Sequence, residues 1–217
     1  MNKQKIIKEV ENYIKKEFEG DSSGHDWPHI HRTWEMAKKI AKKEGGDLFI
    51  IELGALLHDI GDWKFNDDPK AGSKKSRALL EKLGADEPDI AHVCHIVDNV
   101  SFKRSDHTNG IKTLEGKIVQ DADRLDAIGA IGTARTFSYG GSAGRAIHDP
   151  KIKPKLHGKF DVGKRANYGT GINHFYEKLL LVKDRLNTKT AKKIAVPRHK
   201  FLEMYLKQFF KEWDVKI

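Results

Sequence analysis

A histidine followed directly by an aspartate closes the most hydrophobic stretch of the sequence, IIELGALLHDIGDW (residues 50–63). Burying an unpaired carboxylate costs several kcal/mol, so Asp59 needs a cation, a strong set of hydrogen bonds or a metal ion. A long imidazole and a short carboxylate can reach one ion where a helix ends, and Gly61 supplies such an end. The His58-Asp59 pair is therefore either half of a metal site or a simple C-terminal cap.

A second group of imidazoles lies in GHDWPHIHRTWEMA (residues 24–37). His25 and His29 are four residues apart, on one face of a helix, and Arg32 follows three residues after His29. One or two of these histidines are candidate ligands. The alternative is a histidine-rich helix start that faces solvent.

Three aspartates interrupt the otherwise apolar segment KIVQDADRLDAIGAIGTA (residues 117–134), namely Asp121, Asp123 and Asp126. An EF-hand calcium loop is excluded, because Leu125 and Asp126 occupy the positions that require an oxygen ligand and a glycine. A surface network of Asp with Arg or Lys would be the plain alternative, but the apolar neighbours argue against it.

Taken together, a histidine, a His-Asp pair and a distant aspartate offer two nitrogen and two oxygen ligands. Mixed imidazole–carboxylate sites suit Mn²⁺, Fe²⁺ or Zn²⁺ and leave positions for water and substrate. A cysteine-ligated structural zinc is excluded, because Cys94 is the only cysteine.

The elements that position these residues are predicted to be helices, because apolar residues recur at helical spacing nearly everywhere. Capping residues and glycines bound the predicted helices. These helices cover about 2–19, 26–45, 47–61, 73–84, 86–100, 113–129 or beyond, 174–186 and 190–213. Pro197 is expected to kink or split the last one. We predict an all-α fold in one domain over 1–217.

Composition limits the classes of function. The chain has 217 residues, 38% of them hydrophobic, and a net charge of +9, which favours anionic partners. A single cysteine indicates a reducing compartment. No apolar stretch reaches the ~18 residues of a membrane span, and the N-terminus lacks the apolar core of a signal peptide. We expect a cytoplasmic protein without membrane contact.

In order along the chain, these motifs resemble those of the HD-domain metal-dependent phosphohydrolases. They are His29 in an HxxR context, His58-Asp59 in LLHDIGD, and Asp123 in DADRLDAIGAIG. NVSFK (99–103), TARTFSYGG (133–141) and HFYEKLL (174–180) further resemble a small bacterial nucleotide (pyro)phosphohydrolase subgroup, over about residues 25–217.

The resemblance implies an all-helical bundle with an HD core over about 25–135 and C-terminal helices over 170–215. It also implies that His29, His58, Asp59 and Asp123 bind one divalent ion, for which we expect Mn²⁺, with Mg²⁺, Co²⁺, Ni²⁺, Fe²⁺ or Zn²⁺ as alternatives. Asp62 is predicted to be the general acid or base, because it follows His58 by four residues. The remaining predicted roles concern phosphate: Lys64 and Arg124 in catalysis, and Lys103, Arg135, Arg145 and His92 in substrate binding.

The expected reaction is hydrolysis of a nucleoside triphosphate to a monophosphate and pyrophosphate. Phosphomonoesterase or phosphodiesterase activity on nucleoside monophosphates, cyclic or signalling nucleotides is the alternative. A basic nucleic-acid-binding protein is the competing class, but no nucleic-acid module is recognisable. A P-loop is rejected, because YGGSAGR lacks the GK[ST] sequence. His92 and His95 are three residues apart, a spacing that ligands of a second metal ion could have. The sequence is also compatible with a homodimer.

One segment fits no helix pattern. Residues 139–169 contain many glycines and prolines, and over 145–165 basic residues outnumber acidic ones by seven to two. This segment is longer than the ~2–8 residues that usually join two helices. Because it follows the helix of Asp123, we predict a basic lid-like loop that meets substrate phosphates. A solvated surface loop is the alternative.

Overall fold

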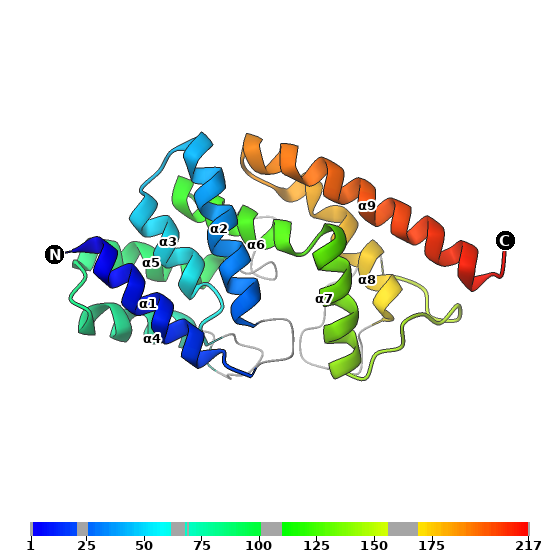
Figure 1. Cartoon of the computed structure of the whole chain (residues 1–217), viewed down its shortest axis with the longest axis horizontal. Helices are drawn as coiled ribbons and strands as arrows, with labels where there is room; N and C mark the ends of the chain where they lie inside the picture. The colour runs from blue at the N-terminus through cyan, green and yellow to red at the C-terminus, as the bar shows by residue number, and fades with distance from the viewer. Residues whose placement is uncertain are drawn as a thin grey trace. The chain divides into compact units, whose positions relative to one another are not determined.

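The computed structural model describes residues 2–20, 26–61, 68, 70–100, 110–155 and 169–216, and all regular structure in these ranges is helical (Figure 1). The predicted all-α fold is thereby confirmed for the described part of the chain. Two compact units are distinguished. The first comprises Met1–Arg124 and Asn187–Ala191, and the second comprises Leu125–Leu186 and Lys192–Ile217. The single domain expected over residues 1–217 stays a prediction.

The first unit is built around its most hydrophobic helix. It contains α1 (Lys3–Glu17), α2 (Trp27–Glu44), α3 (Leu48–Leu57), α4 (Ala71–Lys82), α5 (Glu87–Asn99) and most of α6 (Leu114–Asp126). Helix α3 contacts α1, α2 and α5, and every residue of α3 after Leu48 is buried. Its central place follows from its sequence, because a helix that is apolar all round must be covered on all sides.

The ends of the helices that lead to the candidate ligands are set by capping residues. The Asp26 carboxylate accepts a hydrogen bond from the His29 backbone N–H at 3.0 Å, which fixes the first turn of α2. Asp47 caps α3 in the same way through the Phe49 N–H at 2.9 Å. The turn that follows α3 ends at Gly61, which has a φ of +68°, a conformation that a glycine adopts without strain.

The second unit contains α7 (Gly129–Ser142), α8 (Gly171–Glu177), the 3₁₀ turns η3 (Leu179–Leu181) and η4 (Lys183–Arg185), and most of α9 (Lys189–Trp213). The helix predicted from about 113 to 129 or beyond is two helices. Ile128 is extended (φ −126°, ψ 162°) and Gly129 has a φ of +81°, so the helical backbone is interrupted between α6 and α7. The helix predicted over 174–186 is α8 followed by the two 3₁₀ turns.

Pro197 does not split α9, which is continuous from Lys189 to Trp213. A proline inside a helix leaves the carbonyl four residues earlier without its usual partner. Here that carbonyl belongs to Lys193, and both Lys193 and Pro197 are exposed. Water can therefore hydrate the carbonyl, which explains why the helix persists.

The basic segment 139–169 is only partly a loop. Residues 139–142 form the last turn of α7. The Gly171 N–H donates to the Ala146 carbonyl at 2.9 Å, and the Lys155 N–H donates to Glu177 at 3.0 Å, so this part of the chain is attached to α8. Residues 156–168 of the predicted lid lie outside the described ranges, and the lid over 139–169 stays a prediction.

Candidate metal centre

Four side chains from separate parts of the first unit meet at one point. His29 lies in the first turn of α2, His58 and Asp59 follow the end of α3, and Asp123 lies in α6. The two Nε2 atoms are 3.3 Å apart. Asp59 Oδ2 is 3.4 Å from each of them. Asp123 Oδ1 lies 3.5 Å from His29 Nε2 and 3.8 Å from His58 Nε2.

These distances are the ones that a shared metal ion requires. Ligand atoms that bond one ion at about 2.0–2.2 Å, with angles of about 90–110°, lie about 2.8–3.6 Å from one another. Four of the five distances above fall in this range, and the fifth exceeds it by 0.2 Å. Within the described ranges, His29, His58 and Asp59 are the only group of three or more histidines, cysteines and carboxylates whose ligand atoms all lie within 4.8 Å of one another. Asp123 lies beside the two imidazoles but outside this group, so it is the fourth candidate ligand by its distances to His29 and His58 alone. Two imidazoles and two carboxylates suit Mn²⁺, Fe²⁺ or Zn²⁺.

The backbone of α3 orients the His58 ring. Its Nδ1 atom lies 2.7 Å from the Ala55 carbonyl oxygen, which can only accept a hydrogen bond. Nδ1 therefore carries a proton, and in the neutral ring the lone pair of Nε2 faces His29 and the carboxylates. Such a bond on the outer nitrogen is what fixes the tautomer and the direction of metal-binding histidines.

The site carries a negative potential that attracts cations. Burial lowers the pKa of His58, but the Asp59 carboxylate, with a smaller contribution from Asp123, outweighs burial and raises this pKa to about 9. In the absence of an ion, the two carboxylates thus hold a proton on the imidazole. A divalent ion would neutralise the same two carboxylates with twice the charge of a proton, which is why this set of ligands fits a metal.

Exposure differs between the two kinds of ligand. The side chains of His29 and His58 are 0% and 1% exposed, whereas those of Asp59 and Asp123 are 16% and 28% exposed. The imidazoles thus form the closed side of the site, and the carboxylates lie on the side open to solvent. An ion held here would keep positions accessible to water and substrate, as in catalytic rather than structural metal sites.

The sequence did not reveal what holds α6 in place. Asp121 is fully buried and accepts four hydrogen bonds. They come from the N–H and side-chain amide of Asn187, at 2.8 and 2.9 Å, and from the N–H and hydroxyl of Thr188, at 2.7 and 2.8 Å. Asp121 thus ties α6 to the start of α9, two residues before Asp123. The only signal was the unusual density of aspartates, because the partners lie 66 and 67 residues away.

The other predicted site residues have partners of their own or lie outside the described ranges. His92 contacts the Thr113 hydroxyl at 3.0 Å and Glu115 at 3.7 Å. Arg135 pairs with the buried Asp126 at 3.0 Å, and the Arg145 guanidinium lies 5.3 Å from the Tyr139 ring centre. Arg124 is buried. His25, Asp62, Lys64 and Lys103 lie outside the described ranges.

Comparison with known proteins identifies the class to which this site belongs. The family model described as the HD domain matches residues 27–128, which include all four candidate ligands. The chain is 34% identical to YpgQ from Bacillus subtilis over 213 residues, which are 98% of this chain and 96% of YpgQ. The chain therefore belongs to the HD-domain family.

Solved structures agree with this assignment. A structure from Lactobacillus plantarum matches with a TM-score of 0.88 at 36% identity, covering 100% of both chains. An HD-superfamily hydrolase from Bacillus thuringiensis matches at 45% identity and a TM-score of 0.76, covering 99% of this chain and 100% of that one. YpgQ, solved in complex with ADP, matches at 35% identity and a TM-score of 0.72 over 95% and 97% of the two chains. The protein is a metal-dependent phosphohydrolase of the HD superfamily.

No helix in the described ranges is long and apolar enough to cross a membrane.

Proposed function

We propose that this protein hydrolyses nucleotides, and specifically that it cuts nucleoside triphosphates to a monophosphate and pyrophosphate. The observation that carries the proposal is the convergence of His29, His58 and Asp59, whose ligand atoms lie 3.3–3.4 Å apart, with Asp123 3.5 and 3.8 Å from the two imidazoles, on a partly open surface. The net charge of +9 supports a phosphorylated substrate. That the related YpgQ was solved with ADP supports a nucleotide.

In this proposal the four side chains hold one divalent ion, Mn²⁺ by preference. The ion supplies Lewis-acid chemistry, polarising a phosphoryl oxygen and making water more acidic. The chain's own contribution is placement. The Ala55 carbonyl keeps the proton of His58 on Nδ1. Burial of both imidazoles keeps water away from the closed side, so substrate approaches along Asp59 and Asp123.

Charge neutralisation completes the proposed site. Phosphoryl transfer depends mainly on positioning and on stabilising the charge that develops on the phosphoryl oxygens. Arg124 follows Asp123 directly in α6 and is the described cation nearest in sequence to the ligands. Asp62 and Lys64 follow the His58-Asp59 pair by three to six residues. We assign proton transfer to Asp62 and phosphate contact to Lys64.

Phosphorus NMR of the reaction products tests this function. The protein is incubated with a panel of nucleoside triphosphates, monophosphates and cyclic nucleotides, each with Mn²⁺, Mg²⁺, Co²⁺ or Zn²⁺. We expect a pyrophosphate resonance from at least one triphosphate and no orthophosphate. Orthophosphate release from monophosphates would instead establish a phosphomonoesterase. Ring opening of cyclic nucleotides would establish a phosphodiesterase.

Matched variants connect the activity to the site. His29→Ala and His58→Ala should each abolish turnover, with helix content by circular dichroism nearly unchanged, because a ligand is lost and the helical core is not. His31→Ala is the control, because His31 lies two residues from His29 but is exposed. Full activity and full metal occupancy in His58→Ala would remove the site assignment.

A further inference from the structure

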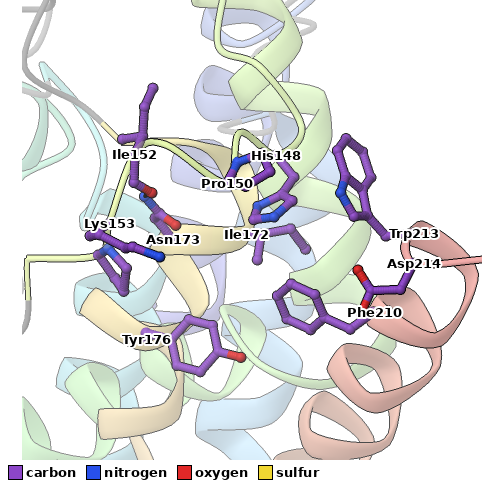
Figure 2. A pocket seen from close by; sticks show the side chains of 11 residues that line it. His148, Pro150, Ile152, Lys153, Ile172, Asn173, Tyr176, Phe210, Trp213 and Asp214 are labelled. Atoms are coloured by element: carbon purple, nitrogen blue, oxygen red, sulfur yellow. Dashed lines mark hydrogen bonds between the residues drawn. The ribbon is translucent and has the colours of Figure 1, made fainter.

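A cavity of about 380 Å³ lies within the second unit. Its lining includes none of the candidate metal ligands, although Lys153 belongs to the basic segment 139–169. Its walls come from the segment 148–154, from α8 and from the C-terminal end of α9. Figure 2 shows the Phe210 and Trp213 rings on one side of this cavity and the Lys153 side chain on the other, with the His148 ring between them. We call this cavity the aromatic pocket.

Hydrogen bonds and ring contacts hold the walls together. The Ile172 N–H donates to the Ile147 carbonyl at 3.0 Å, and the Asn173 side-chain amide donates to the Ile152 carbonyl at 2.8 Å. On the opposite wall, the His148 ring lies edge-on to Trp213 and Phe210, with centroids 4.8 and 5.3 Å away. The segment 148–154 is therefore anchored both to α8 and to α9, and the pocket is formed before any ligand arrives.

The polar groups of the pocket are few and lie at different points of its wall. The Lys153 amino group is turned toward the pocket centre (Figure 2). Asp214, at the end of α9, places a carboxylate next to Phe210, and this carboxylate pairs with Lys216 at 2.7 Å. An anionic group would be repelled by Asp214 and attracted by Lys153. The two charges therefore give the pocket a direction, with its cationic end at Lys153.

We propose that the aromatic pocket binds a small ligand in which a flat heteroaromatic ring is joined to an anionic group, as in a nucleoside monophosphate. The ring would lie against Phe210 and Trp213, and the anion would contact Lys153. Mostly apolar pockets of about 300–1,000 Å³ with a few placed polar groups are typical small-molecule sites. Trp213 is 45% exposed although its ring stacks on that of Phe209 at 5.7 Å, so part of the indole surface is left for a ligand.

An apolar partner surface fits the pocket less well. Covering it with a second copy or another protein would bury the Lys153 ammonium against apolar side chains, and burying a charge without a partner is costly. A ligand that carries an anionic group pairs with the Lys153 ammonium, and its ring covers the exposed surface of the aromatic side chains.

Calorimetric titration of the full chain with AMP, adenosine and inorganic phosphate tests the proposal. The Asp59→Ala variant in EDTA serves as the parent, so that the candidate metal centre does not contribute to binding. We expect one equivalent of AMP to bind, adenosine to bind about tenfold more weakly because it lacks the anion, and phosphate alone to bind hardly at all.

Two substitutions in this parent assign the binding to the pocket. Trp213→Ala should weaken AMP binding about tenfold, the effect of losing one stacked ring. Lys153→Ala should reduce the affinity for AMP to that for adenosine. Lys151→Ala is the matched control, because Lys151 is an exposed lysine two residues away that does not line the pocket. Lys153 is exposed as well, so its removal leaves the fold intact and keeps the test informative if Trp213→Ala is unstable.

Three results would overturn the proposal. The first is the absence of AMP binding at millimolar concentration. The second is equal AMP affinity in the parent, Trp213→Ala and Lys153→Ala proteins. The third is that the protein does not bind AMP and light scattering shows a dimer that Trp213→Ala dissociates. That result would assign the surface to self-association. The metal-dependent hydrolysis is not used in this test, so its outcome is independent of the proposed function.

Discussion

Replacing Asp121 with asparagine should damage the fold more than the metal site, although Asp121 lies only two residues from Asp123. Each oxygen of the Asp121 carboxylate accepts two hydrogen bonds, one pair from Asn187 and the other from Thr188. Asparagine keeps one oxygen and replaces the other with an amide that only donates. The Asn187 pair can survive, but the Thr188 N–H then faces another donor.

The size of the effect follows from these contacts. Losing a charge-assisted hydrogen bond costs about 1.5–3 kcal/mol, and leaving the buried Thr188 N–H unsatisfied costs about 1–3 kcal/mol more. We therefore expect Asp121→Asn to lower the free energy of unfolding by about 3–5 kcal/mol. For a chain of this length that corresponds to a fall in Tm of about 10 °C.

Asp123→Asn is the matched comparison. The Asp123 side chain is 28% exposed, and Oδ1 lies 3.5 and 3.8 Å from the Nε2 atoms of His29 and His58, without the four hydrogen bonds that Asp121 accepts. Its neutralisation should change the free energy of unfolding of the metal-free protein by less than about 1 kcal/mol. The affinity for Mn²⁺ should fall strongly, because a ligand is lost.

Urea unfolding in EDTA and calorimetric titration with Mn²⁺ measure the two effects separately. The expected pattern is a less stable Asp121→Asn that still binds Mn²⁺ when folded, and a stable Asp123→Asn that does not. If Asp121→Asn were as stable as the wild type and had lost Mn²⁺ binding, while Asp123→Asn kept it, the roles of the two carboxylates would be the reverse of those assigned.

Three other predictions concern pH, the proline in α9 and nucleic acid. Burial, together with the charges of Lys178 and Arg145, lowers the pKa of His174 to about 3. Between pH 3 and the ordinary pKa of 6.5, the proton binds to His174 only in the unfolded state. The free energy of unfolding of the wild-type protein should therefore fall as the pH drops below 6.5. The fall should be less than ~1.4 kcal/mol per pH unit, because His174 keeps some exposure. Urea unfolding of His174→Asn should show a shallower dependence, and parallel pH profiles would refute this role. Pro197→Ala should raise the free energy of unfolding by about 1 kcal/mol, because the Lys193 carbonyl regains a helical partner, and a lower Tm would contradict that reasoning. Duplex DNA should bind weakly and detach by about 0.2 M salt in fluorescence anisotropy, whereas tight metal-free binding at that salt would favour a nucleic-acid-binding protein.

Local sequence signals were sufficient for most of the helices of the first unit. Asp26 and Gly45 bound α2 as their capping preferences predict, and the almost wholly apolar sequence of α3, in which Glu52 is the one charged residue, placed it at the centre. These features depend on residues close together in the sequence. Where the signal was ambiguous, the prediction was wrong: Gly129 was included in one long helix, although its positive φ separates α6 from α7.

The candidate site was predictable for a different reason. A carboxylate next to a histidine at the end of an apolar helix is costly without a partner, which drew attention to Asp59 before any resemblance was used. The choice of His29 and Asp123 among their neighbours came from the resemblance to HD phosphohydrolases. The geometry now brings both within 3.5 Å of each other. The anchoring of Asp121 could not be predicted, because its partners lie 66 and 67 residues away and no local pattern connects them.

Anomalous diffraction from a crystal of the protein with bound Mn²⁺ would locate the ion and identify its ligands. We expect one strong peak at about 2.0–2.3 Å from His29 Nε2, His58 Nε2 and one oxygen each of Asp59 and Asp123. A peak bound by other residues, or Mn²⁺ held without His29 and Asp123, would contradict the assignment of these four side chains as the metal centre.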